Sequence, residues 1–143
     1  MLVEFIKNGA LISTSIDKLS DFRSCDFLMT AETTLLSMPE VLDYLKLSEI
    51  DNFINIAVSK LAHGGTIKVG GTNIDAVCRG RINGMLNASE VTNLLYGNGS
   101  HPWDNKVGAY APQDIRQKLE SLNLNILSYR VSDFKFIIEA SRS

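Results

Sequence analysis

Polar side chains suited to acid–base chemistry or hydrogen bonding follow two apolar runs of this chain. They are Glu40, Asp43, Tyr44, Asn73 and Asp75. The first three follow the run at 33–38, and the other two follow the run at 66–69. If both runs are strands of an open α/β sheet, these side chains lie at the carboxyl ends, where such sheets bind ligands. They are therefore candidates to contact a bound ligand there. The alternative is a polar turn that covers the sheet, with Thr72 or Asn73 as a helix N-cap.

A second candidate site lies in the stretch 97–104, whose glycine, asparagine and proline content is typical of a loop. His101 and Trp103 stand close together in this stretch. Such a loop is a candidate lid or partner contact, because functional residues concentrate in loops and tryptophan often anchors interfaces. The alternative is that Trp103 packs onto the core and holds the loop in place.

The sequence does not identify catalytic residues. With only two histidines, no Ser/His/Asp or Cys/His set can be assembled. Cys25 and Cys78 are far apart, and neither has a second cysteine or histidine at the spacing of metal ligands. The catalytic residues therefore stay unknown, and no metal site is predicted.

Composition narrows the class of protein. The 14 Lys and Arg against 16 Asp and Glu give a net charge of −2, which does not indicate nucleic-acid binding. Leu, Ile, Val and Phe make up about a third of the chain, which excludes a disordered protein. No apolar run approaches the roughly 20 residues of a membrane span, and the start is too acidic for a signal peptide. We therefore expect a cytoplasmic protein without a membrane partner.

The elements that position the candidate residues can be predicted from hydrophobic period and turn signals. Alternating residues at 2–13 surround Asn8-Gly9, a pair favoured in type I′ turns, and predict a β-hairpin. The run at 33–38, ended by Pro39, predicts a buried strand. A short helical turn at 40–45 follows it.

A helix is predicted between the two apolar runs. Ser48 is a suitable N-cap with an acidic residue three positions later, and apolar residues recur at helical spacing as far as Leu61. A glycine pair at 64–65 closes the helix, and the strand at 66–69 follows. Together with the strand at 33–38, this order predicts a βαβ unit with a right-handed parallel crossover.

The remaining elements are predicted as helices and a terminal hairpin. The predicted ranges are helices at 75–82, 88–95 and 112–122 and strands at 125–131 and 134–140. Asn87 is a capping signal for the second helix, and Pro112 suits the first position of the third. The two-residue link Ser132-Asp133 predicts that the last two strands are antiparallel.

This order of elements resembles the carboxyl-terminal half of a class I S-adenosylmethionine-dependent methyltransferase. The stretch 39–45 is similar to the segment after the family's fourth strand, and 61–69 is similar to its Leu-Lys-Pro-Gly-Gly turn into the fifth strand. The matching stretches also include 71–75, where the family often has a Thr/Pro-Asn pair, 111–122 as its late helix, and 134–140 as its last strand. The resemblance covers about 33–141 and is nearest to small methyltransferase-like proteins of bacteria and their phages.

The resemblance implies an α/β fold with a reduced Rossmann-like sheet, mainly parallel, with an antiparallel carboxyl-terminal hairpin and helices on its faces. It implies a single domain over 1–143, in which 33–141 form the core and 1–32 form an atypical hairpin and connection. S-adenosylmethionine is the cofactor that the family binds. By this resemblance, the polar set that follows the two apolar runs holds that cofactor.

One departure from the family decides the functional expectation. The family's first strand runs into a glycine-rich turn that lets the backbone approach the cofactor, and no such turn stands in 1–32. We therefore expect a degenerate, non-catalytic binding or scaffold module that lacks the cofactor-binding half. The alternatives are an active enzyme with an altered or oligomer-completed site, or one subunit of a split enzyme.

Loss of the family's middle strands leaves the strand at 33–38 with an unpaired edge. An unpaired apolar edge is an aggregation hazard unless something covers it. We expect the hairpin at 2–13 to cover part of this edge. We also expect a homo-oligomer, most simply a symmetric dimer, or a partner chain that covers the rest.

Overall fold

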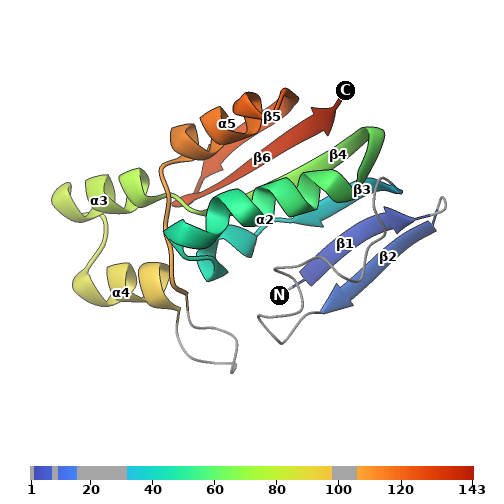
Figure 1. The fold of residues 1–143 in the computed structure, drawn as a ribbon. Coiled ribbons are helices and arrows are strands. Elements are labelled where there is room, and N and C mark those ends of the chain that lie inside the picture. The colour runs from blue at the N-terminus through green and yellow to red at the C-terminus, as the bar shows by residue number, and fades with distance from the viewer. Residues whose placement is uncertain (1, 8–9, 16–31, 98–105) are drawn as a thin grey trace.

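The computed structural model describes residues 2–7, 10–15, 32–97 and 106–143. Their strands form one six-stranded sheet in the order β2-β1-β3-β4-β6-β5 (Figure 1). The strands are β1 (Leu2–Lys7), β2 (Ala10–Ser15), β3 (Thr33–Met38), β4 (Leu61–Thr72), β5 (Leu124–Ser132) and β6 (Lys135–Arg142). The described helices are η1 (Val41–Tyr44), α2 (Leu47–Lys60), α3 (Ile74–Ile82), α4 (Ala88–Tyr96) and α5 (Pro112–Ser121).

The amino-terminal hairpin covers the edge of β3, as the sequence predicts. β1 and β2 pair antiparallel with Lys7 opposite Ala10, and β1 pairs antiparallel with β3 with Phe5 opposite Leu36. The predicted Asn8-Gly9 turn lies outside the described residues. The strand that the sequence left with an open edge is therefore paired on both sides within this chain.

The α/β class and the antiparallel terminal hairpin are confirmed, but the sheet is mixed rather than mainly parallel. β3 and β4 are the parallel pair, with Leu36 opposite Ile67, and the other described pairings are antiparallel. The reason lies in the connections. Neighbours β3 and β4 are joined through η1 and α2, and a parallel pair requires such a crossover, whereas the two-residue turn between β5 and β6 makes that pair antiparallel.

The core lies between one face of the sheet and the helices α2 and α5, which lie on the same side in Figure 1. α2 buries Ile50, Phe53, Ile54 and Ala57, and α5 buries Ile115 and Leu119. Strand residues of this face, such as Leu36, Ile67 and Phe136, are almost completely buried against them. On the other face, Lys68 and Glu139 form a half-exposed ion pair with 3.8 Å between Nζ and Oε2. Helices on both faces were expected, but none of the described helices covers this more polar face.

Helix starts follow the capping signals with one exception. Asn73 and Asn87 cap α3 and α4 through side-chain oxygens that accept the Ala76 and Glu90 amides, and Pro112 begins α5. The predicted Ser48 cap is wrong. α2 begins at Leu47, and the Glu49 carboxylate of its first turn accepts the Lys46 N–H at 3.1 Å. A carboxylate at this position satisfies an amide at the helix start in place of a serine cap.

Two turns determine where β4 and the β5–β6 hairpin lie. α2 ends at Lys60, and β4 begins at once but carries an irregularity at the predicted glycine pair, where Gly64 has φ +74°. The β5–β6 turn consists of Asp133 and Phe134, one residue later than predicted. Both have positive φ, 51° and 65°, as a type I′ turn requires.

Candidate functional site: a buried carboxylate at the carboxyl ends of β3 and β4

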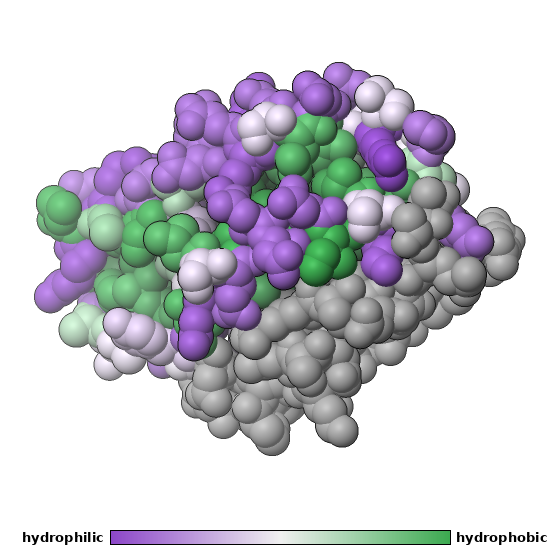
Figure 2. Space-filling model, viewed as in Figure 1, coloured by the Kyte–Doolittle hydropathy of each residue, from purple (hydrophilic) through white to green (hydrophobic). Residues whose placement is uncertain are grey.

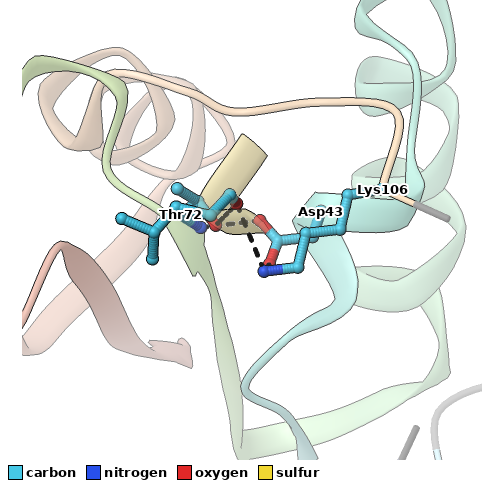
Figure 3. A network of polar contacts seen from close by, with 4 residues as sticks. Asp43, Thr72 and Lys106 are labelled. Atoms are coloured by element: carbon cyan, nitrogen blue, oxygen red, sulfur yellow. Dashed lines mark hydrogen bonds and ion pairs between the residues drawn. The ribbon is translucent and has the colours of Figure 1, made fainter. Parts of the chain in front are cut away.

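Asp43 is the best-connected of the polar residues predicted from the sequence. It lies in η1, just after β3, and only 3% of it is exposed. Its Oδ1 accepts the Thr72 N–H at 2.6 Å, and its Oδ2 lies 3.3 Å from Lys106 Nζ. Figure 3 shows that Thr72, at the end of β4, and Lys106, in the segment that precedes α5, both point at this carboxylate. The carboxylate thus joins the carboxyl ends of the two parallel strands to a distant part of the chain.

Residues 106–110 form a strap across these strand ends. The Asp43 carbonyl accepts the N–H groups of Val107 and Gly108 at 2.8 and 3.2 Å. Tyr110 donates its N–H to the Thr72 carbonyl at 3.2 Å and its hydroxyl to the Leu45 carbonyl. Tyr110 also forms an isolated parallel bridge with Asn73, which ties the 106–110 strap to the residue after β4.

α4 completes the surroundings of Asp43. The Leu94 carbonyl accepts hydrogen bonds from Lys106 Nζ and from Thr72 Oγ1, both at 3.3 Å. The Lys106 side chain is 13% exposed and that of Asp43 is 4% exposed, so most of the cation is enclosed with its partner. The Asp43 oxygens, the Thr72 hydroxyl and the Lys106 ammonium therefore each have a protein partner, as buried polar groups require.

Burial dominates the electrostatics of the network. It raises the pKa of Asp43, although the Thr72 amide and the Lys106 ammonium act to lower it. Burial also raises the pKa of Tyr110 to about 12, with smaller contributions from the charges of Glu49 and Asp43. Removal of a charge from water disfavours the ionised form of both groups.

The other predicted residues have environments that differ from that of Asp43. Glu40 is exposed in the turn before η1, and Asp75 is exposed in the first turn of α3. Tyr44 is 3% exposed and belongs to the hydrophobic core. Asn73 is 2% exposed, and its side chain caps α3, as the alternative interpretation held. His101 and Trp103 lie outside the described residues.

Lys106 and Tyr110 are the members of this site that the sequence did not indicate. Both stand in a stretch without hydrophobic period, between the signals for α4 and α5. One general rule could have pointed to a missing cation, since a buried aspartate is rarely left without a partner. That rule gives no position for the cation. Among the described residues, no group of three or more His, Cys, Asp or Glu side chains could hold a metal ion.

An apolar surface lies beside the site, over α3 and α4. Ile82, Met85 and Tyr96 are exposed by 83%, 69% and 64%, and Figure 2 shows apolar residues gathering over these two helices. α4 buries none of its residues, although its sequence is amphipathic. The two helices extend past the end of the sheet in Figure 1, so the core does not cover their apolar residues.

No protein-family model matches the chain, and neither does any curated protein sequence. Solved structures do match. An O-methyltransferase family protein from Burkholderia thailandensis is similar at 11% identity and a TM-score of 0.55, over 91% of this chain and 34% of the other. A magnesium protoporphyrin IX methyltransferase from Synechocystis with bound SAH is similar at 15% identity and 0.56, over 86% and 49%. A SAM-dependent methyltransferase from Methanosarcina mazei is similar at 12% and 0.57, over 84% and 64%.

These likenesses show the fold, which is that of part of a SAM-dependent methyltransferase. The resemblance expected from the sequence is confirmed at that level. This chain spans about a third of the Burkholderia protein and about half of the Synechocystis enzyme. In the part of the chain that the structure describes, no helix has both the length and the apolar character to cross a bilayer.

Proposed function

We propose that this chain is a methyltransferase-like module that does not transfer methyl groups by itself and acts by binding a partner or a ligand. The observation that carries the proposal is the direction of β1. It lies beside β3 but runs antiparallel to it, with Glu4 opposite Ser37. The amino end of β1 therefore lies beside the carboxyl end of β3.

That direction bears on whether the chain can hold S-adenosylmethionine. In a doubly wound sheet, the nucleotide binds where a parallel strand turns into a helix through a glycine-rich loop. Because β1 runs antiparallel to β3, its carboxyl end at Lys7 lies toward the amino end of β3, where Lys7 pairs with Ala10 at the start of β2. The described residues thus do not fit the cofactor in the family's manner, and we assign no step of a reaction to it.

The state of Asp43 supports the same proposal. A carboxylate that binds a ligand must be accessible to it, whereas Asp43 is only 3% exposed and each of its oxygens already has a protein partner, Thr72 or Lys106. The 106–110 strap also covers the strand ends through the hydrogen bonds of Val107, Gly108 and Tyr110. The five polar residues that the sequence offered as cofactor ligands therefore act mainly in structure under this proposal.

Calorimetric titration with S-adenosylmethionine tests the proposal. We expect no heat of binding up to millimolar ligand, and an intact methyltransferase titrated in the same buffer serves as the positive control. Micromolar binding by the isolated chain would overturn the proposal in favour of an altered site. Binding that appears only at high protein concentration would overturn it in favour of a site completed by a second copy. Binding that appears only with a protein co-purified from the native host would favour a split enzyme.

We also propose that the module self-associates, and that it does so through the apolar surface over α3 and α4. The sequence placed self-association at the edge of β3, but β1 now pairs with that edge. Ile82, Met85 and Tyr96 are exposed apolar residues of the α3–α4 pair. Exposed apolar patches of this kind mark protein contacts. The cytoplasmic location stays a prediction from the sequence.

Sedimentation tests this part independently of the cofactor. We expect a dimer at high micromolar concentration that Ile82→Glu converts to a monomer. Leu127→Glu is the matched control, since Leu127 is 57% exposed on β5, outside the α3–α4 pair. A wild-type monomer at high micromolar concentration, or equal dissociation by both variants, would overturn the assignment.

A further inference from the structure

A pocket of about 540 Å³ lies at the β5–β6 hairpin. It is lined by Arg130, Ser132, Asp133, Lys135, Phe136 and Ile137. Its volume falls within the range of small-molecule sites, roughly 300–1,000 Å³. Nothing in the methyltransferase-like proposal uses it, and the sequence interpretation did not single out any of its residues.

Strand register places the pocket on the face of the sheet opposite α2 and α5. Arg130 pairs with Ile137, and Ser132 pairs with Lys135, so these four residues share one face. The alternate residue Phe136 belongs to the other face, where it is buried in the core. Ile137 is half-buried and provides the apolar floor between the two basic residues.

The two basic residues of the pocket have no protein partner among the described residues. Arg130 and Lys135 are exposed and stand on neighbouring strands, and their side chains take part in none of the ion pairs or hydrogen bonds of the described residues. The nearest acid on the same face of β6, Glu139, is paired with Lys68. Asp133 is the carboxylate in the described lining, and its Oδ2 lies 3.5 Å from Ser132 Oγ.

The turn at the rim of the pocket is held in an uncommon conformation. Phe134 has φ +65°, which is rare for a bulky residue. Its ring lies against α3 at Gly80, where a Cβ would come within 2.8 Å of Phe134 Cε1. The Asn73 N–H donates to the Phe134 carbonyl at 2.9 Å. These contacts fix the backbone of the turn, which lowers the entropic cost of binding at the rim of the pocket.

We propose that this pocket binds a small organic anion in which a carboxylate or phosphate group adjoins an apolar group. Arg130 and Lys135 hold the anionic group, because their side chains share a face and lack an acidic partner. Ile137 contacts the apolar group, and Ser132 offers a hydroxyl. The proposal does not rest on the proposed function, since the residues that line the pocket are not those of the Asp43 network and no methyl donor is involved.

Amide NMR shifts of the labelled chain test the site with three probes. Phenyl phosphate and benzoate carry the two anionic groups on the same ring, and phenol is the neutral control. We expect saturable shifts of the β5–β6 amides with one or both anions, and the tighter anion identifies the class. A response to phenol equal to that of the anions, or no saturable shift at these amides up to tens of millimolar anion, would overturn the proposal.

Charge variants should change the affinity for the anion in both directions. Arg130→Gln and Lys135→Gln each remove a cation and should weaken binding of the better anion roughly tenfold. Asp133→Asn removes the repelling carboxylate and should tighten binding, and asparagine tolerates the positive φ of this turn. Arg79→Gln, an exposed arginine on α3, is the matched control and should change nothing. Equal weakening by Arg79→Gln, or weaker binding by Asp133→Asn, would contradict the assignment.

Discussion

Two groups of charged residues lie at the same end of the sheet, and they differ in whether their charges have partners in the protein. Asp43 and Lys106 are enclosed and paired with each other. Arg130 and Lys135 are exposed and have no ion-pair partner among the described residues. Thr72 connects the two groups, since its amide binds Asp43 and its strand position pairs with Lys135.

The difference separates charges that hold the fold from charges that remain available to a ligand. A buried ion pair has already lost its water, and its members stabilise the strand ends only while they remain together. Exposed cations keep their water and exchange it for an anion at small cost. We therefore expect changes at the Asp43 network to alter stability, and changes at the hairpin pocket to alter binding.

Loss of the buried cation should have the largest effect on stability. Lys106→Met leaves the Asp43 carboxylate enclosed without its ion pair, which should cost about 3–5 kcal/mol of unfolding free energy. Lys68→Met is the control, because the Lys68–Glu139 pair is half-exposed and should contribute about 0–1 kcal/mol. Denaturant unfolding measures both. Similar losses in the two variants would remove the distinction between the two groups.

A methyl group added to the strap should have the next largest effect. A Cβ at Gly108 would lie 2.5 Å from the Tyr110 hydroxyl and 2.7 Å from the Leu45 carbonyl oxygen. Gly108→Ala should therefore destabilise the fold by about 1–3 kcal/mol through overpacking. Ala109→Gly loosens the same strap without adding an atom and should cost at most about 1 kcal/mol. Thermal unfolding that ranks the two variants in the reverse order would contradict the closed strap.

A smaller effect is expected from the strap's side-chain hydrogen bond. Tyr110→Phe removes the donor to the Leu45 carbonyl and should cost about 1 kcal/mol, whereas Tyr96→Phe, at an exposed position, should cost nothing measurable. Absorbance titration gives a second check. The wild type should show an ionisation with a pKa of about 12 that Tyr110→Phe lacks. Identical titration curves for the wild type and Tyr110→Phe at high pH would contradict the burial of Tyr110.

The smallest expected effect is a dependence of stability on pH through Asp43. Burial raises the pKa of Asp43 above its ordinary 3.8, so the folded state binds its proton more tightly than the unfolded state. Its contribution to stability is therefore fully present below pH 3.8 and is lost as pH rises through the folded-state pKa. The unfolding free energy of wild type relative to Asp43→Asn should fall over this window. A constant or rising difference would show that Lys106 outweighs burial.

The same two regions show what the sequence could predict. Asp43 and Asn73 could be placed at the strand ends because hydrophobic period locates the strands. A residue that follows a strand within a few positions must lie near the end of that strand. The capping role of Asn73 follows from its chemistry alone. Glu40 and Asp75 stand at equivalent positions and are exposed, so position in sequence does not separate ligands from surface residues.

The rest required the three-dimensional structure. Lys106 meets Asp43 across a stretch without period, and no local rule links the two residues. The turn at Asp133 and Phe134 contains no glycine, so the usual signal for positive φ is missing, and the ring contact at Gly80 that holds it is long-range. The sequence predicted that the hairpin lies at the edge of the strand at 33–38, but it gave no direction for the pairing. The antiparallel direction of β1 comes from the structure.

The most direct test of the central claim compares both regions in one sample. Amide NMR spectra of the labelled chain would be recorded with S-adenosylmethionine and then with phenyl phosphate or benzoate, following Thr72 and Gly108 at the closed end and Lys135 and Ile137 at the pocket. We predict that millimolar S-adenosylmethionine leaves Thr72 and Gly108 unshifted and that at least one anion shifts Lys135 and Ile137 saturably. Saturable shifts of Thr72 and Gly108 with S-adenosylmethionine would contradict the account.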